Sequence, residues 1–322
     1  DEAILPSLTF AASANTAVQC GAKCVFADIQ DVTVPLISPE DVQKKITPRT
    51  RIIMAVHYAG FSADTASLRD IIDRENDRRS KAGEQRPLFL IEDAAHAAGA
   101  KNAEGKFLGT LGECGCFSLF SNKNIAAGEG GILLTGDQQL FDRMKLLRSH
   151  GLTRQTWERH KHGASQAPYL YDLREPGYNY RPSEITAALA GCQLNKLQSI
   201  NQKRRDIFHY VHHELSDNDK IVLPFQNPES WGTPSYHILP VLLDSVKERI
   251  RIAAELAEAG IQTSNHYRPV HTMSYYQNIA EREWTLPRTE EYAEREMTLP
   301  LHTRLTDAEV EYVIKTLKKA VT

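Results

Sequence analysis

The chain lacks the features that would mark a membrane, secreted or nucleic-acid-binding protein. No apolar run reaches the roughly 18 residues that a bilayer span needs, and the first residues are not a basic and then apolar signal segment. Its five cysteines are an odd number and do not suggest a disulfide framework. A net charge of −3 gives no reason to expect nucleic acid as a partner. We therefore expect a cytoplasmic protein that binds neither membrane nor nucleic acid.

The chain also lacks a pattern of metal ligands. Cys114 and Cys116 are the only close cysteine pair, and no further ligands stand at matching spacing, so we interpret them as small core residues in or beside a strand. His160 and His162 lie in a basic stretch with no apparent third ligand, which favours a solvent-exposed loop. No metal site is predicted.

What the chain does contain is an alternation of strand and helix patterns, which predicts an α/β fold with a largely parallel sheet. At 322 residues we expect two domains, a large one over 1–205 and a smaller C-terminal α/β domain over 206–322. Strands are predicted over 1–6, 24–29, 51–57, 88–91, 236–243 and 261–266, and helices over 11–20, 38–46, 66–79, 137–149, 183–216, 245–259 and from Thr306. The helix over 137–149 is expected to bury one apolar face, formed by Leu140, Phe141, Met144 and Leu147.

One stretch, from Phe89 to Gly131, carries the chemistry that the rest of the chain is arranged around. The short apolar run that ends in Glu92 and Asp93 is typical of a parallel strand buried on both faces. Ligands of open α/β sheets collect at the carboxyl ends of strands, which is where Asp93 would lie. The alternative interpretation is an aspartate that caps a following helix.

Lys123 follows thirty residues later, after the run Cys116 to Phe120 and before the glycine-rich Gly128 to Gly131. Most lysines before a glycine turn are surface lysines. A lysine held near the sheet would instead be desolvated, which lowers its pKa and makes the free amine a nucleophile. A buried amine and a buried acid on neighbouring strand ends fit a pyridoxal phosphate (PLP) site, although the spacing alone does not decide it.

Four motifs, in order, resemble one family. They are IEDAAHAAGA at 91–100, GTLGECGCFSLFSNKNIAAGEGG at 109–131, LRSHG at 147–151 and GYNYRPSEITAALA at 177–190. The chain is similar over its whole length to the DegT/DnrJ/EryC1/StrS family of PLP-dependent nucleotide-sugar aminotransferases. This resemblance implies the PLP-dependent transferase type I fold, a homodimer with shared active sites, and a role such as polysaccharide biosynthesis.

The resemblance also implies roles for the residues around the cofactor. Lys123 would be the catalytic residue, first as the Schiff-base lysine and then as the general acid and base that moves the proton. Asp93 would keep the pyridine nitrogen protonated. His96 would lie beside the ring's 3′-oxygen, and Phe10 would stack on the ring. A single His or Phe is otherwise more often part of the core.

Further residues match family positions at the edge of the site. Ser118 would donate to the cofactor phosphate, and Asn179 would reach that phosphate from the other subunit, although both residue types are common in turns. The resemblance also gives candidates for contacts with the substrate, namely Arg181, His266, Tyr267 and Arg268. For Arg181, a structural salt bridge is the alternative interpretation.

The function predicted from the resemblance is transfer of an amino group from glutamate to a keto group of a nucleotide-linked sugar. The stretches VHYAG (56–60) and GLTRQTWERH (151–160) look closest to members that act on UDP-linked 4-keto pentoses. One alternative is a catalytically silent PLP-binding or regulatory protein. Another is a dehydratase of the same family, which the presence of Lys123 disfavours because those members lack this lysine.

Two further expectations concern the periphery of the site. The stretch 152–176 has no clear periodicity, and the resemblance implies a loop that reaches the partner's active site. In the family a serine-glycine-threonine turn that binds phosphate comes before the strand at Asp1 to Pro6. We therefore expect the chain as printed to be N-terminally trimmed and to hold PLP weakly, because backbone N–H groups at a helix N-terminus are the main phosphate donors.

Overall fold

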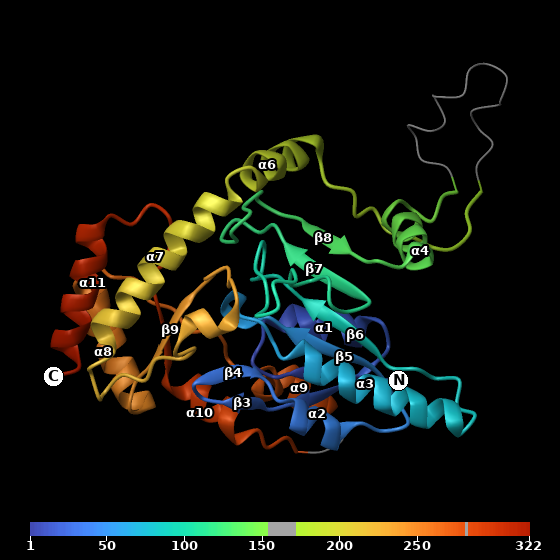
Figure 1. The fold of residues 1–322 in the computed structure, drawn as a ribbon, viewed down its shortest axis with the longest axis horizontal. Coiled ribbons are helices and arrows are strands. Elements are labelled where there is room, and N and C mark those ends of the chain that lie inside the picture. The colour runs from blue at the N-terminus through green and yellow to red at the C-terminus, as the bar shows by residue number, and fades with distance from the viewer. Residues whose placement is uncertain (154–171, 281–282) are drawn as a thin grey trace.

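The computed structural model describes residues 1–153, 172–280 and 283–322. Its centre is a six-stranded sheet in the order β2-β1-β5-β6-β7-β8 (Figure 1). The first five strands run parallel and β8 is antiparallel to β7, which confirms the predicted, largely parallel sheet. The strands are β1 (Glu2–Pro6), β2 (Lys23–Ala27), β5 (Thr50–Val56), β6 (Phe89–Asp93), β7 (Cys114–Ser118) and β8 (Gly131–Leu134).

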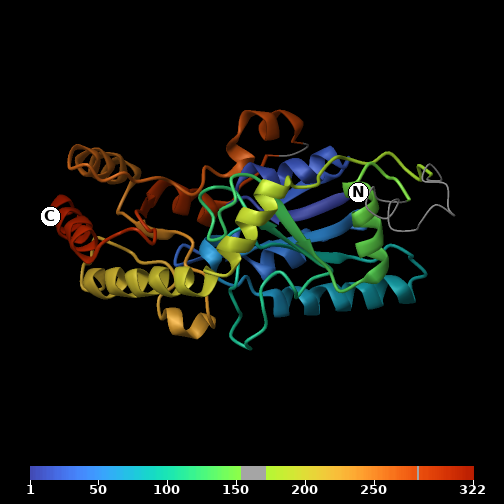
Figure 2. The same ribbon diagram turned by 90° about the horizontal axis from the view of Figure 1, so that it is seen from above.

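Helices cover both faces of this sheet, as a three-layer α/β fold requires (Figure 2). Successive residues of a strand point to opposite faces, so neighbours such as Ile4 and Leu5 belong to different cores. Ile4 packs in the cluster on the side of α2 (Pro39–Lys45) and α3 (Thr65–Lys81). Leu5 packs in the cluster on the side of α1 (Ala11–Gln19) and α9 (Ser274–Ile279).

Local signals in the sequence explain where these helices begin and end. Ser38 caps α2 by accepting a hydrogen bond from the Asp41 N–H, and Pro39 takes the first helical position. Gly21, at φ 75°, follows α1 in the left-handed conformation that favours glycine. Thr306 and Glu309 form the predicted capping box at the start of α11 (Asp307–Ala320).

The C-terminal part contains a second, two-stranded antiparallel sheet of β9 (Leu239–Leu242) and β10 (Glu296–Leu299). The other elements of this part are α7 (Leu197–Leu215), η2 (Pro228–Trp231), α8 (Val246–Glu258), η3 (Val270–Thr272) and α10 (Pro287–Arg295). Its core continues into the N-terminal part, where the Phe61 and Phe225 rings stack at a centroid distance of 3.8 Å. The division of domains near residue 205 stays a prediction, since one cluster of buried side chains spans both parts.

Some predicted elements are wrong. Residues 261–266 do not form a strand, and only Ser264 bridges to Thr298. The physical reason lies in the backbone N–H of His266, which donates to the Glu296 carboxylate at 2.7 Å and is not available for a strand partner. A short hairpin of β3 (Ile29–Asp31) and β4 (Val34–Ile37) was not predicted, and neither was β10.

Two predicted helices differ in detail. The helix expected over 183–216 is interrupted at Asn195 and Lys196, and it forms α6 (Glu184–Leu194) and α7. The helix α4 (Gln138–Arg148) exists, but it has no buried residue, and the Phe141 side chain of its apolar face is 49% exposed. The other three residues of that face, Leu140, Met144 and Leu147, are half-buried.

Two other expectations concern single segments. Strand β6 is fully covered on one face only, because Phe89, Ile91 and Asp93 stay half-buried. Cys114 and Cys116 lie in β7 as half-buried free thiols.

The predicted loop over 152–176, with His160 and His162, falls largely outside the described residues. Among the described residues, no helix combines the length and apolarity needed to cross a bilayer.

Candidate active site

Lys123 lies in the loop between β7 and β8, in a turn in which its backbone N–H donates to the Phe120 carbonyl at 2.9 Å. Its side chain turns back towards the protein interior. Desolvation by burial lowers the pKa of the Lys123 amine to about 8, while the nearby Asp93 carboxylate acts in the opposite direction. The fraction of this lysine that is the uncharged, nucleophilic amine near neutral pH is therefore far larger than for a solvated lysine.

Asp93 ends β6, directly beside Val56 of β5 and Cys116 of β7 in the strand register. Its carboxylate accepts hydrogen bonds from the Ser13 hydroxyl at 2.7 Å and from the Ala95 N–H at 3.1 Å. Turns, and no helix, follow it over 94–99, so the helix-cap interpretation is wrong. The two bonds hold the carboxylate in place at the carboxyl edge of the sheet.

His96, Tyr267 and Phe10 form an aromatic group next to Lys123 and Asp93. His96 Nε2 is 2.9 Å from the Tyr267 hydroxyl, and the Tyr267 and Phe10 ring centroids are 6.1 Å apart. Burial lowers the pKa of His96 well below its ordinary value, and the charge of Lys123 adds to this effect. Burial raises the pKa of Tyr267, with Asp93 as the next cause. Both rings are therefore uncharged at neutral pH.

His266 approaches the same group from the C-terminal part. Its Nδ1 lies 2.8 Å from the Thr298 hydroxyl. Burial, and then the charge of Lys123, lowers the pKa of His266 to about 4. The structure thus brings together six of the predicted site residues: Phe10, Asp93, His96, Lys123, His266 and Tyr267.

The other predicted residues do not join this cluster through any hydrogen bond within the described part of the chain. The Ser118 hydroxyl accepts from the Phe120 N–H at 3.3 Å. Asn179 and Arg181 are exposed and contact each other at 3.4 Å. The exposed Arg268 guanidinium donates to the Thr272 carbonyl and hydroxyl.

Glu92, the neighbour of Asp93, is a buried carboxylate whose importance the sequence analysis missed. It accepts backbone N–H groups from Gly109, Leu111 and Gly112 and the ring N–H of His57, at 2.5–2.9 Å. His57 Nδ1 accepts the Ala63 N–H, so its proton lies on Nε2. Burial alone would raise the pKa of Glu92, but the hydrogen bond from His57 and the backbone donors outweigh it and hold that pKa below its ordinary value.

We expect Glu92→Ala to destabilise the protein by about 3–5 kcal/mol at neutral pH, because it leaves buried donors without an acceptor. Since the folded pKa is depressed, the stabilising contribution is complete above the unfolded pKa and fades as the pH falls through the folded value. Urea unfolding from neutral to acidic pH should therefore show a gap between wild type and variant that narrows in acid. Glu104→Ala, which removes an exposed loop carboxylate, is the control; equal effects of the two substitutions would contradict this account.

Comparison with known proteins identifies the family. The sequence model of the DegT/DnrJ/EryC1/StrS aminotransferase family matches residues 1–318. The chain is 31% identical over 326 residues to the spore coat polysaccharide biosynthesis protein SpsC of Bacillus subtilis, covering 100% of this chain and 79% of SpsC. The chain belongs to the DegT/DnrJ/EryC1/StrS aminotransferase family. The predicted family is confirmed.

Solved structures of this family share the fold. Spr1654 of Streptococcus pneumoniae, in its pyridoxamine phosphate (PMP) form, superposes with a TM-score of 0.88 at 28% identity, over 100% of this chain and 82% of that one. PseC of Helicobacter pylori, an aminotransferase involved in the biosynthesis of pseudoaminic acid, gives a TM-score of 0.86 at 27% identity, over 99% and 79%. The type I fold and the dependence of this aminotransferase family on PLP are confirmed.

The residues of this DegT-family chain fit PLP. Lys123 offers a desolvated amine, and the Asp93 carboxylate offers an acceptor for the ring nitrogen. Phe10 is 64% exposed beside the cluster, which leaves its ring face open for stacking against an aromatic cofactor. These are the attachment point, the counter-charge and the apolar surface that the cofactor needs.

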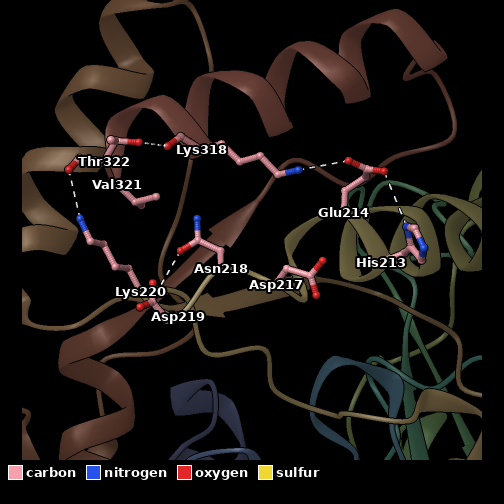
Figure 3. Close-up of a pocket in the computed structure, with 9 residues that line it drawn as sticks. All are labelled: His213, Glu214, Asp217, Asn218, Asp219, Lys220, Lys318, Val321 and Thr322. Carbon is pink, nitrogen blue, oxygen red and sulfur yellow. Dashed lines mark hydrogen bonds and ion pairs between the residues drawn. The ribbon is translucent and has the colours of Figure 1, made fainter.

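Two hollows in the structure differ in their relation to this cluster. A cleft of about 810 Å³ has His237 and His266 in its wall, together with Asn122 and Thr298. A smaller hollow of about 430 Å³ lies between the ends of α7 and α11 (Figure 3). Charged side chains line it and pair with one another, as Lys318 does with Glu214 at 3.1 Å, and none of the predicted site residues lies there.

Proposed function

We propose that this chain transfers an amino group from glutamate to a keto group of a nucleotide-linked sugar. The observation that carries the proposal is the Lys123 amine, desolvated to a pKa of about 8 beside the Asp93 carboxylate. Bound PLP supplies an electron-withdrawing ring that accepts the electron pair left when a proton leaves the carbon bearing the amine.

The other roles in the reaction belong to residues of this chain. Lys123 attaches the cofactor and then carries the proton between the two carbons that exchange it. Asp93, fixed by Ser13, keeps the ring nitrogen protonated. Phe10 would stack on the ring of the bound cofactor, and His96, held by Tyr267, would lie beside its oxygen substituent. Ser118 would donate to the cofactor phosphate.

We assign the cleft beside His266 to the sugar-nucleotide substrate. Tyr267, Arg268 and Arg181 stay candidates for substrate contacts, although none of the three is in the wall of this cleft. The cleft borders the cluster through His237 and His266 and is large enough for a multi-ring ligand. The restriction to UDP-linked 4-keto pentoses stays a prediction without structural support. That prediction rests on two stretches of sequence. In the first, VHYAG (56–60), His57 and Tyr58 are core residues that contact Glu92 and Tyr292. Most of the second, 151–160, lies outside the described residues.

The test is a titration of the PLP-loaded protein with glutamate, followed by absorbance, and then a panel of nucleotide-linked keto sugars. We expect conversion of the cofactor to the PMP form with release of 2-oxoglutarate, and recovery of the PLP form when a keto sugar is added. A spectrum that glutamate leaves unchanged would support the silent-binder alternative. Conversion by glutamate without recovery on any keto sugar would leave an aminotransferase with a different acceptor.

We also propose that the active unit is a homodimer with shared sites. In this chain β8, α4 and α6 each carry exposed apolar side chains, which supports an interaction surface there. They are Ile132, Leu133, Leu134, Phe141, Ile185, Leu189 and Leu194, of which Ile185 is 82% exposed. Asn179 lies between α4 and α6 in the chain, and its backbone is held by a bridge to Ser149.

A mixing experiment tests the shared site. Lys123→Ala chains and Asn179→Ala chains should each be nearly inactive, whereas their mixture should recover activity. The reason is that a hybrid dimer rebuilds one complete site from an intact Lys123 and an intact Asn179 on different chains. Each variant taken through the same unfolding and refolding by itself is the control. No recovery in the mixture, or a fully active monomer in sedimentation, would contradict the proposal.

A further inference from the structure

Two asparagine side chains near Lys123, Asn124 and Asn201, have amide orientations that are fixed by backbone carbonyl groups. Asn201 places its side-chain amide nitrogen 2.9 Å from the Ala98 carbonyl, and Asn124 places its own 2.9 Å from the Ser235 carbonyl. A carbonyl oxygen only accepts, so the atom facing it is the NH₂ group in both side chains. The second proton of the Asn124 amide then goes to Asn201 Oδ1 at 2.7 Å.

This arrangement fixes the tautomer of His237. The only atom that Asn124 has left for His237 is its carbonyl oxygen, Oδ1, which lies 2.9 Å from His237 Nδ1. Because Oδ1 cannot donate, the ring proton is on Nδ1, and Nε2 of the neutral ring is an acceptor. That Nε2 faces the amine of Lys123 at 3.5 Å.

The surroundings keep His237 in this state. It is 5% exposed, and its ring lies on that of His96 with centroids 4.2 Å apart. Burial lowers the pKa of His237 well below its ordinary value, and the charge of Lys123 acts in the same direction. The titratable groups that act on Lys123 or feel its charge are Asp93, His96, His237 and His266, and the pKa of each of the three histidines is lowered, mainly by burial.

We propose that His237 is a positioning residue for Lys123, held by Asn124 and Asn201 in the tautomer that accepts an N–H of the lysine amine. The proposal rests on the proposed role of Lys123. In the proton transfer a C–H bond of the amine-bearing carbon breaks and an N–H bond of Lys123 forms, and the reverse occurs at the other carbon. His237 keeps its own proton on Nδ1 throughout. It fixes one N–H direction, so that the remaining positions of the amine point to the reacting carbon.

The first test needs no substitution in the protein that is measured. Long-range nitrogen–proton NMR of wild-type protein with isotopically labelled histidine distinguishes the tautomers, and the His237 signals are assigned by their loss in His237→Gln. We expect a protonated Nδ1 and an unprotonated Nε2. A proton on Nε2, or on both nitrogens at neutral pH, would overturn the proposal.

The second test compares two substitutions that each keep half of the ring's hydrogen bonding. His237→Asn keeps a donor where Nδ1 lies and removes the acceptor, whereas His237→Gln keeps an amide oxygen that reaches the place of Nε2. An acceptor stabilises the lysine ammonium, so the pKa of Lys123 should fall in His237→Asn and stay close to that of wild type in His237→Gln. The readout is the pH dependence of acetylation of Lys123 in cofactor-free protein, followed by mass spectrometry.

Turnover gives a second readout of the same pair. We expect kcat to fall about 10- to 100-fold in His237→Asn with little change in KM, and to be largely restored in His237→Gln. If both variants titrate and turn over as wild type does, or if both lose kcat equally, the hydrogen bond at Nε2 has no role and the proposal fails. If wild-type protein itself does not exchange an amino group with glutamate, the proposed function fails, while the NMR and acetylation results still decide the state of His237.

Discussion

Replacing Lys123 with alanine is expected to abolish transamination, which is the largest effect of any single substitution in this chain. Lys123 contacts His237 of the His96–His237 pair, and its amine is desolvated beside Asp93. Without the amine, the cofactor has no covalent attachment and the proton has no carrier. Turnover with glutamate should fall below detection, and borohydride should no longer fix the cofactor to the protein.

Lys101→Ala is a matched control for this experiment. Lys101 is half-buried, and its amine lies 4.5 Å from the centre of the Phe107 ring, outside the cluster. Its removal should leave both the rate and the borohydride adduct unchanged. A Lys123→Ala protein that still formed a reducible adduct would place the attachment on another lysine and would contradict the assignment.

Replacing Asp93 with asparagine should reduce the rate by several orders of magnitude while leaving the fold intact. The amide oxygen can still accept from the Ser13 hydroxyl or the Ala95 N–H, so the local structure survives. What is lost is the negative charge that keeps the cofactor's ring nitrogen protonated. Stopped-flow absorbance with saturating glutamate measures the rate, and thermal unfolding checks the fold.

Ser13→Ala separates charge from geometry at the same place. It removes one hydrogen bond to Asp93 but leaves the carboxylate, so its effect on rate should be far smaller than that of Asp93→Asn. Near wild-type turnover of Asp93→Asn would mean that this residue only stabilises the turn that begins at Ala95. Similar losses in both variants would mean that the position of the carboxylate matters more than its charge.

Sequence patterns predicted those residues of the site that stand at one strand end or within one motif. Asp93 follows an apolar strand, and Lys123 precedes a glycine turn, so their neighbourhood follows from strand order in a parallel sheet. His237 is 114 residues from Lys123 in the chain, and no local pattern links the two. The same holds for the asparagines that fix its tautomer, since Asn124 pairs with Asn201 of α7 and with Ser235, both far away in the chain.

The wrong predictions have equally specific causes. The pattern over 261–266 favours a strand, but a buried side chain, Glu296, took the backbone donor that a strand partner would need. The same carboxylate also accepts from the Thr298 hydroxyl, and burial raises its pKa to about 8. The helix α4 forms with its apolar stripe only half-buried, because periodicity predicts that a helix has an apolar face but not how far the fold covers it.

The most direct test of the central claim is to reduce the PLP-loaded protein with borohydride, digest it and locate the cofactor by mass spectrometry. We predict a single modified peptide in which the cofactor is attached to Lys123, and loss of that modification when glutamate is added before the reduction, because the cofactor then leaves the lysine as PMP. Attachment to a different lysine, or a Lys123 adduct that glutamate does not diminish, would contradict the account.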